Sequence, residues 1–215
     1  MEQIKVSPLE AICEFRFTLD TAWDMAVPGL VYKMLRDEFP VRKQRLLRDV
    51  ECVLFFTEDG MTFIQLGPRL LSVHVLKSCP TWAWFKSKIE LAFSALGQVV
   101  EIAGLERISL RYINRIDGLD LLGELGRCFR FHPPTFGLRG DVVDFSIDSE
   151  FACANGRDRC RIRFETIPTD DARSPASILD IDYFLVNMQD AQAVMSWLEK
   201  AHKRVMSVFD ECLAE

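Results

Sequence analysis

The chain has 215 residues, 49% hydrophobic and 27% charged, which is typical of a globular protein and excludes a disordered chain or a coiled coil. Its 32 acidic and 26 basic residues give a net charge of −6, which argues against nucleic-acid binding through an extended basic surface. No apolar run approaches the roughly 20 residues of a membrane helix, and the start lacks the pattern of a signal peptide. We therefore expect a cytoplasmic protein without a membrane segment.

The first half of the sequence alternates between strand and helix patterns. Apolar residues at every second position predict a strand over 11–17, and Pro28 is suited to begin a helix that Pro40 ends. Four short strands are predicted next, at 45–50, 52–57, 62–66 and 70–76. Thr81 is the predicted N-cap of a second helix, whose apolar stripe runs to Val100.

The second half has a similar pattern without similar residues. Alternation predicts a strand over 108–116, which a short helix over 121–129 and an irregular loop over 132–140 follow. Three further strands are predicted at 142–152, 159–166 and 178–186, the last preceded by a polar loop over 169–177. Apolar residues at helical spacing predict a final helix over 194–212, with Asn187 as a plausible cap.

Both halves therefore have the pattern β-α-β(3–4)-α, and we predict a single α+β domain of two pseudo-repeats, about 1–103 and 104–215. Two such halves joined edge to edge make a curved antiparallel sheet with helices on one side, which resembles the saddle of the TATA-box-binding protein. The alternative is a helix-grip fold, in which a curved sheet wraps one long C-terminal helix over a cavity. Tyr112, Asn114 and His74 would line that cavity.

Motifs for catalysis and metal binding are scarce. The sequence has no Gly-rich nucleotide loop and no Gly-x-Ser-x-Gly motif. The seven cysteines include no Cys-x-x-Cys pair, and the three histidines form no metal-ligand pattern. We expect His74 on a sheet face or in the core, and His202 on the polar side of the last helix. The sequence thus predicts a protein that is not an enzyme and carries no cofactor or metal.

The most informative pattern is a set of arginines at strand spacing, which we predict to project from one side of one sheet, away from the helices. These are Arg111, Arg115, Arg159, Arg161 and Arg163, with Arg16 as their counterpart in the first half. Neighbouring strand candidates carry acids at alternate positions, namely Asp144, Asp148, Asp180 and Asp182. Two interpretations stay open: a solvated face neutralised by Arg–Asp pairs, or an interface, where arginine is favoured.

A second candidate interface is the region around the loop over 132–140. Phe131 and Phe136, together with two prolines, make it unusually rich in large apolar groups, which either pack down or contact another chain. The candidate partner-binding residues are therefore Arg111, Arg115, Arg159, Arg161, Arg163, Phe131 and Phe136.

Two segments carry a resemblance to a known family: Cys13-Glu-Phe-Arg-Phe17 and Leu110-Arg-Tyr-Ile-Asn-Arg-Ile116. Through them the chain resembles a sporadically distributed bacterial family of uncharacterised proteins, some of which occur near CRISPR and phage-defence genes. The resemblance implies a defence context, and with the missing catalytic motifs it suggests a non-enzymatic adaptor or regulatory subunit that binds proteins of the same locus. The alternatives are a helix-grip ligand-binding or hydrolytic domain, and a single-stranded nucleic-acid binder, which the acidic balance opposes.

Overall fold

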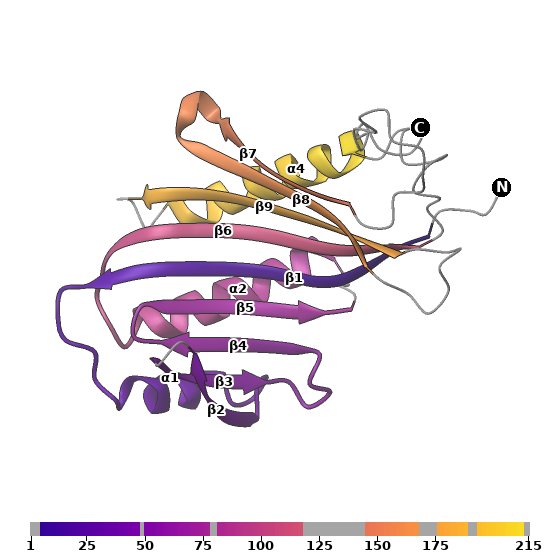
Figure 1. Ribbon diagram of the computed structural model, residues 1–215. Coiled ribbons are helices and arrows are strands. Elements are labelled where there is room, and N and C mark those ends of the chain that lie inside the picture. Colours follow the sequence, from indigo (N-terminus) through magenta and orange to yellow (C-terminus); the bar gives the residue numbers. More distant parts are fainter. Residues whose placement is uncertain are drawn as a thin grey trace, which may run out of the picture.

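A computed structural model describes residues 5–47, 50–77, 81–117, 145–167, 176–188 and 193–212. The predicted α+β class is confirmed, because these residues form one open antiparallel sheet and three α-helices (Figure 1). The strands are β1 (Lys5–Leu19), β2 (Val41–Leu47), β3 (Val50–Phe56), β4 (Thr62–Gly67), β5 (Leu70–Leu76), β6 (Ile102–Asp117), β7 (Ser146–Cys153), β8 (Asp158–Ile167) and β9 (Ala176–Met188). The helices are α1 (Val27–Leu35), α2 (Trp82–Gly97) and α4 (Val194–Cys212).

The strand order across the sheet is β2-β3-β4-β5-β1-β6-β9-β8-β7. In each half the first strand, β1 or β6, lies at the centre, and the last strand of that half, β5 or β9, pairs with it. The two central strands pair with each other in antiparallel register from Lys5 opposite Asp117 to Leu19 opposite Ile102. The halves are thus joined through one long strand pair, and the remaining strands extend outward in matching order.

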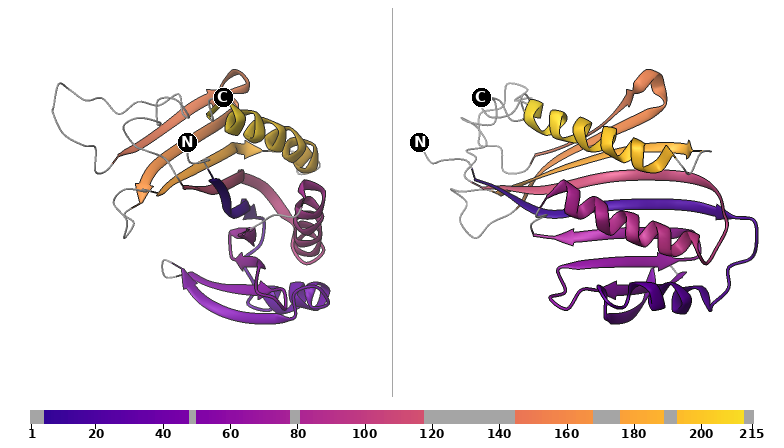
Figure 2. Two further views of the ribbon diagram at one scale, coloured as in Figure 1. Left: turned by 90° about the vertical axis from the view of Figure 1, so that its right-hand side faces the viewer. Right: turned by 180° about the vertical axis from the view of Figure 1, so that it is seen from behind.

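The sheet is curved, and the three described helices cover its outer side (Figure 2, left). The outermost strands on both sides bend away from the helices, so the opposite side of the sheet is hollowed. We call this side, which carries no described helix, the concave face. Among the described residues no helix is both long enough and apolar enough to cross a membrane.

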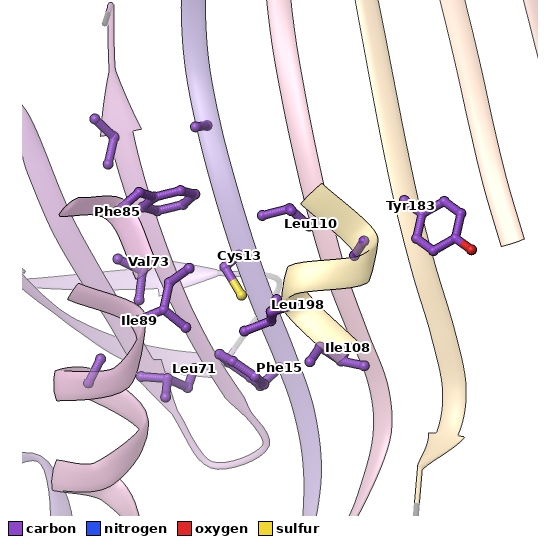
Figure 3. Close-up of a cluster of buried hydrophobic side chains, with 14 of the residues drawn as sticks. Cys13, Phe15, Leu71, Val73, Phe85, Ile89, Ile108, Leu110, Tyr183 and Leu198 are labelled. Carbon is purple, nitrogen blue, oxygen red and sulfur yellow. The ribbon is translucent and has the colours of Figure 1, made fainter. Parts of the chain in front are cut away.

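The core lies between the sheet and the helices. Alternate residues of β1 point into it, and Cys13 and Phe15 are fully buried there. Figure 3 shows both side chains between Ile89 of α2 and Leu198 of α4. One helix from each half therefore packs over the same central strand, which gives the two halves a common apolar core.

Alternation along three strands with charged residues at the intervening positions predicts six core residues: Phe15, Phe17, Leu110, Tyr112, Ile162 and Phe164. Burial confirms all but one of them. Five of the six have an exposed fraction of 9% or less, namely Phe15, Phe17, Leu110, Ile162 and Phe164. Tyr112 also faces the helices but is only partly buried. Its hydroxyl lies at the edge of the core, 3.1 Å from Nδ1 of His202. Its polar end needs such a partner, which a position deeper among apolar side chains would not provide.

Several predicted element boundaries are wrong. The strand expected from Arg45 begins at Val41, because this edge strand is exposed on both sides and lacks an alternating pattern. Helix α1 ends at Leu35, before Pro40. Asn187 does not cap α4, since β9 continues to Met188 and Asn187 lies within it. Thr81 does cap α2, because its side chain accepts a hydrogen bond from the backbone N–H of Trp84.

Other boundaries lie partly outside the described residues. Phe145 precedes β7 and is not part of a strand, although a strand was expected from Val142. The polar loop expected over 169–177 ends earlier, because Ala176 and Ser177 already belong to β9. The short helix predicted over 121–129 and the loop over 132–140 lie outside the described residues.

A polar contact joins α2 of the first half to α4 of the second. The rings of Trp82 and His202 stack with centroids 4.3 Å apart, and the indole N–H of Trp82 donates to Glu199 at 3.0 Å. Lys86 forms an ion pair with the same carboxylate at 2.8 Å. His202 was expected on the polar side of its helix, but it is partly buried in this contact. The contact adds a specific link between halves that otherwise share only the sheet and the core.

We expect Phe15→Ala and Phe164→Ala each to lower the free energy of unfolding by about 3–5 kcal/mol, because each removes a fully buried ring and leaves a cavity. Denaturant unfolding followed by circular dichroism measures the loss. Phe151→Ala is the matched control, because Phe151 is 50% exposed on β7 and its removal should cost about 0.5 kcal/mol or less. Equal losses in all three variants would mean that the strand register is wrong.

We expect stability to fall as the solution becomes acidic, in part because of His202. Burial lowers the pKa of His202 below its ordinary value of 6.5, while nearby Glu199 acts in the opposite direction. Below pH 6.5 the unfolded chain therefore binds the proton more readily than the folded one, and stability present above that pH is lost. Melting temperatures between about pH 8 and pH 5 should fall more steeply for the native chain than for His202→Phe. Parallel curves for the two proteins would contradict this assignment.

Candidate functional site

The strand register brings most of the predicted arginines to the concave face. Directly paired residues lie on the same side of a sheet, and Arg111 of β6 pairs with Ile12 of β1, whose neighbours Ala11 and Cys13 face the helices. Arg111 also pairs with Asp182 of β9, which in turn pairs with Arg161 of β8. By alternation Arg115, Arg159 and Arg163 share that side. The prediction that these five arginines project from one side, away from the helices, is confirmed.

The concave face contains a hollow of about 410 Å³. Its lining comes from five strands: Ile12, Glu14, Arg16, His74, Arg107, Ser109, Arg111, Arg161, Arg163, Asp180 and Asp182. Ser109 pairs with Glu14 on one side and with Phe184 on the other, and it is 5% exposed. Because serine is much smaller than the arginines two positions away on either side, Arg107 and Arg111, the surface is depressed at this point. We call this depression the Ser109 hollow.

Carboxylates hold the arginines around the hollow. Arg111 donates two hydrogen bonds to Asp180, at 2.7 and 2.6 Å, and Arg107 donates one to Asp182 at 2.5 Å. At the rim, Arg161 donates twice to Asp148, at 2.7 and 2.5 Å, and Arg163 donates to the same carboxylate at 3.0 Å. Bidentate pairs of this kind fix the plane of a guanidinium as well as its position. The positions of these guanidinium groups are therefore set by carboxylates of the same chain.

Burial differs among the acids, and their pKa values differ accordingly. Burial raises the pKa of Asp182 above its ordinary value, against the opposing effects of Arg107 and Arg111. At the exposed rim the hydrogen bonds from Arg161 lower the pKa of Asp148 to about 2. The hydrogen bond to Asp180 likewise raises the pKa of Arg111. Burial thus makes ionisation of Asp182 less favourable, whereas the arginines at the rim make ionisation of Asp148 more favourable.

The predicted interface residues are only partly brought together. Arg111, Arg161 and Arg163 line the Ser109 hollow, whereas Arg115 lies farther along β6 and pairs with Asp117 at 2.8 Å. Arg159 lies on the same face outside the lining and has no ion pair among the described residues. Phe131, Phe136 and Asp144 lie outside the described residues. The role of all these residues in binding a partner stays a prediction.

The sequence prediction overlooked Arg107 and Ser109 as members of the site. It began the central strand at Ile108, but β6 begins at Ile102 and includes Arg107 at the same spacing of two that relates Ser109 and Arg111. Extending the alternation back by a few residues would have found Arg107. The place of Ser109 had no comparable signal, because a serine on a strand indicates a hollow only when its neighbours on other strands are known.

A chain of hydrogen-bonding groups crosses one end of the hollow. Nδ1 of His74 lies 2.7 Å from a carboxylate oxygen of Glu10, and Nε2 lies 2.8 Å from the hydroxyl of Ser72. The order acid, histidine, serine matches that of a hydrolytic triad. However, Ser72 is only 2% exposed, so its hydroxyl is not accessible to a substrate. The His74 ring also stacks on Phe63 at 4.3 Å, so this chain holds the ring in place as part of the sheet surface.

The cavity expected for a helix-grip domain is not formed by its predicted residues. His74 pairs with Ile12 and faces the concave side, whereas Tyr112 pairs with Ala11 and faces the helices together with Asn114. The structure therefore separates these three residues onto opposite sides of the sheet. Within the described ranges no group of three or more His, Cys, Asp or Glu side chains is arranged to hold a metal ion.

Comparison with known proteins adds no family: no protein-family model matches the chain, and no curated protein matches it significantly.

We expect the pKa of Asp148 to be near 2 in the native chain and to rise toward its ordinary value of 3.8 in Arg161→Gln, because the main hydrogen-bond donors are lost. Titration of the side-chain carboxyl followed by carbon NMR measures both values. Arg115→Gln is the control, since Arg115 pairs with Asp117 and does not contact Asp148. If Arg161→Gln leaves the titration of Asp148 unchanged, the rim pair does not exist in solution.

Proposed function

We propose that the protein is a non-enzymatic adaptor or regulatory subunit that binds a protein partner on the concave face of its sheet. The observation that carries the proposal is the Ser109 hollow, in which five arginines and three acids from separate strands converge. Arginine is enriched at protein interfaces because its planar guanidinium can stack, donate several hydrogen bonds and stay charged. The absence of an accessible nucleophile at Ser72 supports a binding role over a hydrolytic one.

The pairing of the arginines also supports a protein partner. A side chain that is already held loses little rotational freedom on binding, so its contacts contribute more of their energy to affinity. The face presents both signs of charge, with Asp180 and Asp182 beside Arg111. A protein surface can match such a mosaic, whereas a continuous row of phosphates would meet the acids as well as the arginines.

We also propose that the two halves of the sheet form a saddle of two pseudo-repeats. The matching strand order of the two halves and the hollowed face support a saddle of two pseudo-repeats, like that of the TATA-box-binding protein. The biological setting rests on the family resemblance alone. We propose that the partner is encoded at the same locus as this protein, within a CRISPR or phage-defence system, and that both act in the cytoplasm.

Co-expression with the products of neighbouring genes, followed by affinity purification, tests the proposal. We expect the native chain to retain a partner, and Arg161→Glu to lose it, because the reversal places a negative charge at the rim. Arg204→Glu is the matched control, because it makes the same charge change at an exposed position of α4 on the helix side. A milder variant, Arg161→Gln, guards against loss of the fold, which a melting curve monitors.

Two outcomes would contradict the proposal. One is a native chain that purifies alone from every such co-expression. The other is a partner that the native chain, Arg161→Glu and Arg204→Glu all retain in equal amount.

A further inference from the structure

We propose that Arg16 and Arg107, at one end of the Ser109 hollow, form a receptor for a carboxylate that is carried by an acidic segment of the protein partner. This inference rests on the proposed function and assigns the chemistry that the partner brings to the site. It is carried by the placement of the two arginines, by their unused hydrogen-bond donors and by the mosaic of charges around them.

The two arginines stand directly opposite each other. Arg16 of β1 and Arg107 of β6 are register partners in the antiparallel pair, so their side chains leave the same face from adjacent positions. Like charges directly opposite each other destabilise a sheet. The register of this strand pair shifts between Arg16 and Phe17, and such irregularities occur often beside functional sites, where they redirect a side chain. Glu14 and Asp182 already offset part of this repulsion, and an anion bound by both arginines would reduce it further.

Both arginines have N–H donors that no described residue accepts. Arg16 donates one hydrogen bond among the described residues, from Nε to Glu14, and its side chain is 53% exposed. Arg107 also donates one, from Nη2 to Asp182. Each guanidinium has five N–H donors, so the pair presents more donors than its acids accept. A carboxylate oxygen can accept several of them at once, and it is the acceptor whose geometry matches the planar fork.

Arg107 is held in a fixed orientation. Its guanidinium lies 3.9 Å from the ring centroid of Phe184, which pairs with Ser109 on the floor of the hollow. Nε of Arg107 and Oδ1 of Asp182 are buried without hydrogen-bond partners among the described residues. Native proteins leave few buried polar atoms in this state, and those that remain gather where a network is incomplete. Among the described residues, the hydrogen-bond network around Arg107 is therefore incomplete.

The surroundings favour isolated carboxylates over a polyanion. Glu14 and Asp182 lie directly beside the arginine pair, and Asp148 is bound to Arg161 at the rim. A nucleic-acid strand carries a charge on every nucleotide and would place phosphates against these acids. An acidic side chain in a polypeptide can sit on the arginine pair while neutral or basic neighbours face the acids. Charge complementarity thus assigns the occupant as a protein segment.

Titration with short peptides tests the receptor without the natural partner. The probe, called here the glutamate peptide, is a blocked hexapeptide in which one glutamate lies among serines and glycines. It is compared with the same peptide carrying glutamine in place of glutamate, with inorganic phosphate and with a hexathymidylate oligonucleotide, at low ionic strength to limit screening. NMR signals of the arginine Nε–H groups report which side chains respond. We expect the glutamate peptide to shift the signals of Arg16 and Arg107, to bind more tightly than the oligonucleotide, and to leave the signal of Arg115 unchanged.

Variants separate a specific receptor from a general charge effect. Arg107→Gln and Arg16→Gln should each weaken binding of the glutamate peptide about tenfold, because each removes charged hydrogen bonds to the ligand. Arg115→Gln, which removes an arginine of the same strand outside the hollow, should change it less than about twofold. Asp182→Asn should strengthen binding, since it removes the carboxylate that competes for Arg107. Melting curves verify that each variant is folded.

Three results would overturn the proposal that Arg16 and Arg107 form a carboxylate receptor. One is an equal effect of Arg115→Gln and Arg107→Gln, which indicates attraction by net charge alone. Another is the absence of any response of Arg16 and Arg107 to the glutamate peptide. The third is tighter, Arg107-dependent binding of phosphate or of the oligonucleotide, which would assign the site to another class of ligand.

Partner capture distinguishes this inference from the proposed function. If Arg161→Glu loses the co-expressed partner and Arg107→Gln retains it in full, the concave face binds a protein but the carboxylate receptor is wrong. If both variants retain the partner in full, the proposed interface itself is wrong.

Discussion

The pairing of β1 with β6 is the constraint on which the rest of the structure depends. It joins the first strands of the two halves, and with them both sets of strands, into one sheet, and it runs almost the full length of both strands. Because side chains alternate along a strand, one register fixes both sides at once. Cys13 and Phe15 meet α2 and α4, while Glu14 and Arg16 meet the hollow. A slip of one residue would exchange the core for the polar face.

The polar face follows from that register and from the curvature of the sheet. Arginines and acids from β1, β6, β8 and β9 lie within reach of one another because the outer strands bend toward the same side. Their pairs are not alike in strength. Exposed pairs at the rim contribute little to stability, because water and salt screen them. Asp180 lies deeper, and its bidentate bond to Arg111 compensates for the solvation that it loses.

The described helices make the two sides of the sheet different, because they cover only one of them. With α2 and α4 packed on the convex side, every described helix leaves the concave face uncovered. The stacked rings of Trp82 and His202 and the ion pair of Lys86 with Glu199 join these helices across the two halves. They connect the first turns of α2 to the middle of α4. The result is a sheet that the described helices support from one side, with a face of polar side chains on the other.

The sequence by itself determined the class of fold, the central strands, most of the core and the side on which the arginines lie, because each depends on periodicity within one segment. Phe15, Phe164 and Arg161 could be assigned to a face from their immediate neighbours. It did not determine the extent of β2, whose exposed residues lack alternation, or the end of β9 at Met188. Only the tertiary structure decided which acid meets which arginine, that His74 and Tyr112 lie on opposite sides, and that Ser109 lies at the floor of a hollow. Those features depend on the register between strands that are distant in the chain and on the curvature of the whole sheet, and neither leaves a local pattern.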